Sequence, residues 1–151
     1  MLDNKISIEF QSLSQNEGFA RVAVSAFIAQ LDPTIDEMAD VKTAVSEAVT
    51  NSIIHGYENK KDGIIRIEAC ISRNNVTIKI VDFGKGMTDV EKAMEPLFTT
   101  KAEAERSGMG FSFMEAFMDS LEVESTPGKG TLVKMSKIIG KGRKIWTTQS
   151  L

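Results

Sequence analysis

The chain has 151 residues, of which 42% are apolar and 26% are charged. This composition is typical of one soluble domain with a single sizeable core, and the length excludes a two-lobed kinase or a multidomain motor. The net charge of −3 is unevenly distributed, because residues 1–124 carry 12 basic and 21 acidic side chains and the remainder carries 6 basic and no acidic ones. An acidic body argues against a nucleic-acid surface spread over the domain, so we expect no direct nucleic-acid contact.

Cysteine and histidine usage also limits the chemistry. Cys70 is the only cysteine and His55 the only histidine, so neither an internal disulfide nor a Cys/His zinc cluster is expected. The first ten residues alternate polar and apolar, and no stretch approaches the ~18 apolar residues of a membrane span. We expect a cytoplasmic protein that does not contact a membrane.

The first third of the chain predicts one strand and two helices. Residues 6–10 alternate as in a strand that is buried on one face. Ser14 with Glu17, and Thr34 with Glu37, are two capping-box patterns, each followed by apolar residues at helical spacing. The first stripe comprises Phe19, Val22, Ala23, Ala26 and Phe27, and the second comprises Met38, Val41, Val45, Ala48 and Val49.

The rest of the chain predicts a hairpin, a short helix, a loop and a final helix with two strands. Residues 65–71 and 76–80 alternate around a tight turn, and Thr88 with Glu91 is expected to cap a short helix through Met94. Residues 96–110 lack apolar periodicity and are predicted to form a mobile loop. The final elements are a helix over 111–118 and strands over 121–125 and 131–135. Together they predict a two-layer α/β sandwich, with a mixed, mostly antiparallel sheet and helices on one face.

Asp82 is the first candidate for chemistry. It shares the inward strand phase of Val76, Ile78 and Ile80, so its carboxylate should point toward the helices and needs hydrogen-bond donors there. One interpretation is a carboxylate that only accepts bonds from the following glycine turn. The other is a pocket base that accepts a bond from a ligand amino group, where Gly84 and Gly86 allow a flat ring to approach the backbone.

A second candidate is the segment Ser107-Gly108-Met109-Gly110, which leads from the predicted loop into the final helix. A glycine-rich turn that opens a helix presents free backbone N–H groups at the positive end of the helix dipole, which suits a phosphate. Glycine pairs are more often simple turns, so this pattern alone is moderate support.

The third candidate is a polar stripe on the second helix. Glu47, Thr50, Asn51 and His55 share one face of that helix. The simple alternative is a solvated face on which Glu47 and Asn51 bond each other. The functional interpretation is a general base beside a ligand for Mg²⁺, a cation that takes few protein oxygens and completes its shell with phosphate and water. His55 is expected to be structural.

Four segments taken together resemble a known superfamily. They are Glu47-Ala48-Val49-Thr50-Asn51-Ser52-Ile53-Ile54-His55, Asp82-Phe83-Gly84-Lys85-Gly86, Gly108-Met109-Gly110 and Gly130-Thr131. Their order and spacing are similar to the ATP-site boxes of the GHKL superfamily of gyrase, heat-shock-90 chaperones, histidine kinases and MutL. Within it the chain resembles the anti-sigma-factor serine kinases, and most of all their sporulation branch, to which Pro96-Leu97-Phe98-Thr99-Thr100-Lys101 and Glu105-Arg106-Ser107 are also similar.

The resemblance implies a Bergerat-type fold that binds ATP or ADP with Mg²⁺. It implies that Asp82 binds the adenine amino group near Gly86 and Thr131, that Asn51 ligates Mg²⁺, and that Glu47 is the base for a serine hydroxyl. The remaining implied nucleotide contacts are Gly84, Ser107, Gly108, Met109 and Gly110, with Thr99, Thr100, Lys101 and the catalytic Arg106 in a lid.

The resemblance also implies partners. These are a sigma factor of the sporulation (sigma F) type, an anti-anti-sigma factor that is phosphorylated on serine, and a second copy of the chain in a homodimer. Arg21 on the first helix is implied to contact a partner. A stress-response sigma factor is an alternative target, and a nucleotide-gated inhibitor without catalysis or a gyrase-like ATPase are alternative functions.

The chain divides into a kinase domain over residues 1–136 and a basic tail over residues 137–151. No motif accounts for the tail. Its run Lys141-Gly142-Arg143-Lys144 favours disorder, and the alternatives are a contact for an acidic partner or a remnant of cloning.

Overall fold

The computed structural model describes residues 3–95 and 102–140, with the backbone alone for residues 102–109. The strands are β1 (Asp3–Gln11), β2 (Ile64–Ser72), β3 (Asn75–Asp82), β4 (Ser120–Thr126) and β5 (Gly130–Ile138). The helices are α1 (Gln15–Ile28), α2 (Ile35–Asn51), α3 (Val90–Met94) and α4 (Ala102–Phe117), with a 3₁₀ turn over Ala29–Leu31 and a π-helical turn, η2, over Ser52–Gly56. In this part of the chain no helix is long and apolar enough to cross a membrane.

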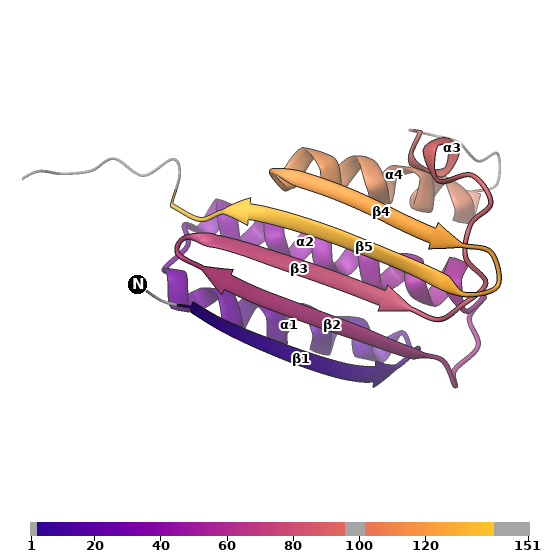
Figure 1. Cartoon of the computed structure of the whole chain (residues 1–151), viewed down its shortest axis with the longest axis horizontal. Helices are drawn as coiled ribbons and strands as arrows, with labels where there is room; N and C mark the ends of the chain where they lie inside the picture. Colours follow the sequence, from indigo (N-terminus) through magenta and orange to yellow (C-terminus); the bar gives the residue numbers. More distant parts are fainter. Residues whose placement is uncertain (1–2, 96–101, 141–151) are drawn as a thin grey trace, which may run out of the picture.

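The five strands form one sheet in the order β1-β2-β3-β5-β4. Helices α1, α2 and α4 cover one face of it, as Figure 1 shows. This arrangement confirms the predicted two-layer α/β sandwich. Every pairing between the described strands is antiparallel, so the expected parallel component is absent among them.

The core lies between the sheet and α2. Strand alternation turns Ile65, Ile67, Ile78 and Ile80 toward the helices, and all four are fully buried. Helix α2 begins at the predicted capping box, in which the Thr34 hydroxyl accepts from the Glu37 N–H and the Glu37 carboxylate accepts from the Thr34 N–H. The apolar stripe of α2 is buried as predicted, with Met38 packed at its edge.

Helix α1 differs from the prediction in both its cap and its buried face. Ser14 has a helical backbone conformation, so the Glu17 N–H donates to the Ser14 carbonyl at 3.2 Å and the Ser14 side chain makes no capping bond. The Glu17 carboxylate accepts from the Ser46 hydroxyl of α2. The buried face also differs from the predicted stripe. Phe19 and Val22 are 56% and 61% exposed, and the buried residues are Ala20, Val24, Phe27 and Ile28.

The segment before β4 also corrects two predictions. Asp89, not Thr88, caps α3, since its carboxylate accepts from the Lys92 N–H at 3.0 Å. Residues 102–110, predicted to be loop, belong to α4. Their Ala, Glu and Arg residues are strong helix formers, so the intrinsic helix preference outweighs the missing apolar periodicity. Residues 96–101 lie outside the described part of the chain.

The last strand extends past the predicted domain boundary. Lys137 lies in β5, where its ammonium donates to the Phe117 carbonyl at 2.8 Å and lies 3.6 Å from the Asp40 carboxylate. Ile139 is buried, and the Gly140 N–H donates to Glu37. The fold therefore includes residues 137–140, and the remaining tail residues, 141–151, lie outside the described part.

Candidate nucleotide-binding site

Asp82 lies at the end of the central strand β3 with its side chain turned toward the helices, as predicted. It is 5% exposed, and its Oδ1 accepts from the Gly84 N–H at 3.0 Å. Burial raises the pKa of the Asp82 carboxyl, while hydrogen bonds from the Gly84 N–H, the Ser52 side chain and the Thr131 backbone offset part of the rise. The Gly86 N–H, expected in one interpretation to share this role, does not appear among these donors.

The glycines beside Asp82 are required by the protein's own backbone. A Cβ on Gly84 would lie 2.0 Å from the Gly56 carbonyl oxygen, and a Cβ on Gly86 would lie 2.2 Å from the Thr126 carbonyl oxygen. Gly86 also has a positive φ of 71°. The contacts with Gly56 and Thr126 already require glycine at both positions, and the approach of a flat ring to this backbone stays a prediction.

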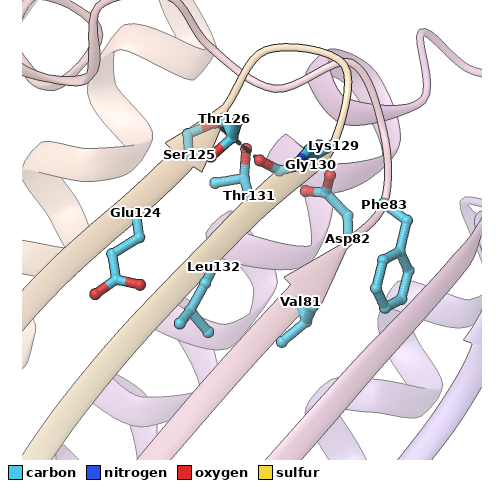
Figure 2. Close-up of a pocket in the computed structure, with 10 residues that line it drawn as sticks. All are labelled: Val81, Asp82, Phe83, Glu124, Ser125, Thr126, Lys129, Gly130, Thr131 and Leu132. Carbon is cyan, nitrogen blue, oxygen red and sulfur yellow. Dashed lines mark hydrogen bonds between the residues drawn. The ribbon is translucent and has the colours of Figure 1, made fainter.

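A hollow of about 230 Å³ lies beside Asp82 at the ends of β3, β4 and β5. Figure 2 shows Asp82 and Thr131 near the loop that joins β4 to β5, with Leu132 and Val81 lower on the sheet. The Thr131 hydroxyl lies 2.8 Å from the Ser125 hydroxyl, which holds it in place. The structure thus brings the predicted Thr131 next to Asp82, since the two residues are paired across β5 and β3.

Glu47 and Asn51 meet helix α4 at Gly110. A Cβ built on Gly110 would lie 3.1 Å from Glu47 Oε2 and 3.2 Å from Asn51 Nδ2. Both side chains therefore point from the stripe on α2 toward α4, and the solvated-face alternative is wrong for this pair. Thr50 and His55, the other members of the stripe, are half-buried.

Asn51 carries a polar atom that fits a ligand. Its Nδ2 is buried and has no hydrogen-bond partner among the described residues, although a buried amide normally has one. Oxygen and nitrogen of an amide exchange by a simple flip, so either can face a ligand. The described residues contain no cluster of three or more His, Cys, Asp or Glu side chains. The oxygen that Asn51 presents after such a flip fits Mg²⁺, which takes few protein oxygens and the rest from phosphate and water.

His55 occupies the half-buried end of the stripe. Burial lowers the pKa of His55, and the nearby positive charge of Lys85 lowers it further. The imidazole is therefore neutral at pH 7 and carries no charge toward the site.

The predicted phosphate and lid residues are only partly described. Thr99, Thr100 and Lys101 lie outside the described residues, as do the side chains of Arg106, Ser107 and Met109. Gly108 and Gly110 lie inside α4 and not in a turn that opens a helix. Because helix-interior N–H groups already bond to carbonyls four residues earlier, the predicted free donors are not present in this conformation.

Arg21 is far from this site along the chain and lies on α1. It is exposed, and its Nη1 lies 3.9 Å from Glu17 Oε1. Nothing in the described contacts tests its predicted role with a partner.

Two residues of the site were not predicted from the sequence. Ser52 is 4% exposed and its side chain bonds to Asp82. Tyr57 directly follows η2, and its hydroxyl accepts from the Phe83 N–H at 2.7 Å. Both lie beside the stripe on α2, and their continuity with it is the only sequence signal that could have found them.

Comparisons with known proteins place the chain in a class. The family model of the histidine kinase-like ATPase domain matches residues 11–137. The crystal structure of the RsbU and RsbW domains from Mycobacterium tuberculosis is similar in fold, with a TM-score of 0.65 at 18% identity over 90% of this chain and 32% of that one. A blue-light activated histidine kinase from Erythrobacter litoralis gives a TM-score of 0.55 at 15% identity, over 80% of this chain and 41% of that one. The fold is that of a histidine kinase-like ATPase domain.

Curated relatives are much closer in sequence. The anti-sigma F factor of Thermoanaerobacter sp. strain X514 is 66% identical over 140 residues, which are 93% of this chain and 97% of that protein. The anti-sigma F factor of Clostridium botulinum strain Alaska E43 is 68% identical over 137 residues, which are 91% of this chain and 96% of that protein. The chain belongs to the anti-sigma F factor family of histidine kinase-like ATPase domains.

Proposed function

We propose that this protein is an anti-sigma factor that binds ATP with Mg²⁺ and phosphorylates a serine of an anti-anti-sigma factor. The single observation that carries the proposal is the convergence of Glu47 and Asn51 on Gly110 of α4, where Asn51 Nδ2 is buried without a partner. Membership of the family and the buried Asp82 support nucleotide binding in particular.

Each of three residues has a distinct part in the proposed reaction. The Asp82 carboxylate accepts a hydrogen bond from the adenine amino group, because its buried position excludes competing water. Asn51 holds Mg²⁺, which neutralises phosphate charge when bound. Glu47 lies one turn earlier on α2 and accepts the proton of the incoming serine hydroxyl. The serine oxygen then forms a bond to the terminal phosphorus of ATP, and ADP leaves.

Phosphate binding in this proposal requires α4 to change. Gly108 and Gly110 can donate their N–H groups to phosphate only when the first turns of α4 open, since those groups are now inside the helix. Gly110 lies against Glu47 and Asn51, so the opening also exposes both side chains to the nucleotide. Phosphate contacts then replace the intrahelical bonds that are lost.

The implied partners complete the proposal. The relatives are named anti-sigma F factors, which supports binding of a sigma factor of the sporulation type by this chain. A homodimer would present two copies of the exposed face of α1, where Phe19, Val22 and Arg21 lie. A pull-down from sporulating cells should recover that sigma factor, and recovery of a stress-response sigma factor instead would correct the target.

The kinase proposal is tested by phosphate transfer. The protein, γ-labelled ATP, Mg²⁺ and an anti-anti-sigma protein should give a labelled serine on the latter. Glu47→Ala should lower transfer by at least about 10²-fold and leave ATP affinity within about twofold, since Asp82 and Asn51 remain. Glu122→Ala is the matched control, because Glu122 lies on β4, where its carboxylate is 3.7 Å from the Lys134 ammonium.

The outcomes separate the alternatives. Transfer that is absent from the wild type, with intact nucleotide and sigma-factor binding, would show a nucleotide-gated inhibitor without catalysis. Steady ATP hydrolysis without any labelled protein would indicate the gyrase-like ATPase. A Glu47→Ala variant that transfers as well as Glu122→Ala would show that Glu47 is not the base.

A further inference from the structure

The loop that follows Asp82 is held against η2 and Tyr57 by three contacts. The Lys85 N–H donates to the Gly56 carbonyl at 2.9 Å, and Gly84 packs so closely on Gly56 that no Cβ fits between them. The Phe83 N–H donates to the Tyr57 hydroxyl at 2.7 Å. Of these three contacts, only the bond from the Phe83 N–H to the Tyr57 hydroxyl uses a side-chain atom, so a substitution at Tyr57 can remove it.

The Tyr57 side chain is itself held from two sides. Its hydroxyl donates to the Ile64 carbonyl at the start of β2, and its ring lies against Gly63, where a Cβ would be 2.5 Å from the ring. Tyr57 ends η2, with its N–H bonded to the Ser52 carbonyl at 2.9 Å. The hydroxyl is therefore a fixed point between η2, β2 and the loop after β3.

The Phe83 amide is the atom through which this fixed point reaches the site. It belongs to the peptide plane that joins Asp82 to Phe83, so holding it limits rotation about the Asp82 Cα–C bond. The following amide along the chain, that of Gly84, donates to Asp82 Oδ1 at 3.0 Å. Tyr57 therefore fixes the backbone from which the Asp82 side chain extends, while Gly84, Ser52 and Thr131 bond to the carboxylate itself.

We infer that Tyr57 is a positioning residue for nucleotide recognition, which fixes the Asp82–Phe83 peptide and thereby aims the Asp82 carboxylate at the base. This inference rests on the proposed nucleotide function. It assigns Tyr57 to specificity for the base and not to phosphate transfer. Adenine carries an amino donor where guanine carries a carbonyl acceptor, so an aimed carboxylate favours adenine.

Tyr57→Phe tests the inference because it removes the hydroxyl and keeps the ring against Gly63. We expect the Kd and KM for ATP to rise about three- to tenfold, as for loss of one hydrogen bond. We expect the preference for ATP over GTP to narrow and kcat at saturating ATP to stay unchanged. With no nucleotide present, the Phe83 amide hydrogen should exchange with solvent faster in Tyr57→Phe than in the wild type.

Two further variants make the result specific. Gly63→Ala pushes on the Tyr57 ring and leaves its hydroxyl chemically intact, so it should reproduce the loss of ATP preference. Ser120→Ala removes a hydroxyl contact of 2.5 Å with Ser136, which lies far along β5 from Thr131, and should change neither binding nor preference. A general loss of stability would weaken ATP and GTP equally.

The failures are distinguishable. Unchanged Phe83 exchange or an unchanged ATP-to-GTP ratio in Tyr57→Phe, with wild-type ATP binding intact, overturns the positioning role alone. A fall in kcat at saturating ATP would also overturn it, since it would place Tyr57 in the transfer step. A wild-type chain that binds no nucleotide overturns the proposed function and the inference together.

Discussion

Asp82 shows how one residue is set by three neighbouring segments. Its strand phase turns it inward, burial raises its pKa, and donors from Ser52, Gly84 and Thr131 hold the charged form. An ionised carboxylate in this setting costs folding free energy that only partly returns through its hydrogen bonds. We expect such a residue to contribute more to ligand binding than to stability, because perturbed carboxyl groups of this kind are typical of functional positions.

Asp82→Asn should weaken ATP binding about 30- to 150-fold in calorimetry while the variant stays folded. The amide is nearly the same size, but it presents one oxygen in place of two and adds an NH₂ group that faces the existing donors. The expected loss is about 2–3 kcal/mol of binding free energy, in the range for charge-assisted hydrogen bonds. An Asp82→Asn protein that binds ATP like the wild type would disprove the adenine contact.

The free energy of unfolding of the wild type should depend on pH through Asp82, and Asp82→Asn should lack this dependence. The folded pKa of Asp82 lies above its reference value of 3.8, so between those two values the folded chain binds more protons than the unfolded chain. The Asp82 contribution therefore makes the wild type less stable as pH rises through this window. Denaturant unfolding of both proteins from pH 4 to pH 7 should show this decline in the wild type relative to Asp82→Asn.

At the scale of elements, the site depends on how closely α2, η2 and the loop after β3 approach one another. Helix α2 continues directly into η2, whose wider π-helical turn brings Ser52 to Asp82 and Gly56 to Gly84. π-helical turns are rare and often occur at functional sites. Helix α4 makes a similar close approach to α2 through Gly110.

Two glycine substitutions should therefore have opposite effects on the free energy of unfolding. Gly84→Ala places a Cβ 2.0 Å from the Gly56 carbonyl oxygen, and overpacking of this kind costs about 1–3 kcal/mol. Gly18→Ala lies inside α1, where the nearest atom to the added Cβ is Arg21 Nη2 at 4.0 Å, and should stabilise by about 0.5–1 kcal/mol.

Urea denaturation measures both changes, and Gly18→Ala is the matched control for Gly84→Ala because each adds one methyl group. A Gly84→Ala protein as stable as the wild type would mean that the loop after β3 is not pressed against η2.

At the scale of the whole molecule, the sheet order places the Asp82 strand in the centre. Strand β3 is flanked by β2 and β5, and α2 covers it, so the site is built on the best-supported part of the fold (Figure 1). The basic residues of the last third divide between this fold and the tail. Lys137 is used structurally, since it joins β5 to Asp40 of α2 and to the C-terminal end of α4.

Removal of residues 141–151 should leave the melting temperature and ATP affinity unchanged. Strand β5 ends at Ile138, and the Gly140 N–H donates to Glu37, so every sheet pairing between the described strands lies before the cut. Differential scanning calorimetry and ATP titration of the truncated chain provide the measurement. A lower melting temperature of the chain truncated after residue 140 would contradict a boundary at that residue. So would a chain truncated after residue 136 that has the melting temperature of the wild type.

Local pattern in the sequence determined much of the fold. The strand phases, the Thr34 capping box, the stripe of α2 and the inward direction of Asp82 all follow from periods of 2 and 3.6 residues, which act over neighbouring positions. The same spacing predicted that Glu47 and Asn51 share a face. The four ATP-site motifs then indicated a superfamily that the family model and the curated relatives confirm.

Only the tertiary structure decided what depends on contacts between segments far apart in sequence. The Glu17 carboxylate accepts from Ser46 on α2 and not from the Ser14 N–H, and α1 buries a different face from the predicted one. Gly84 and Gly56, or Gly110 and Glu47, meet only after the layers pack. Tyr57 gained its position because its hydroxyl reaches β2 and the loop after β3 at once. Sequence spacing cannot encode such meetings, since each depends on where two independent backbones lie.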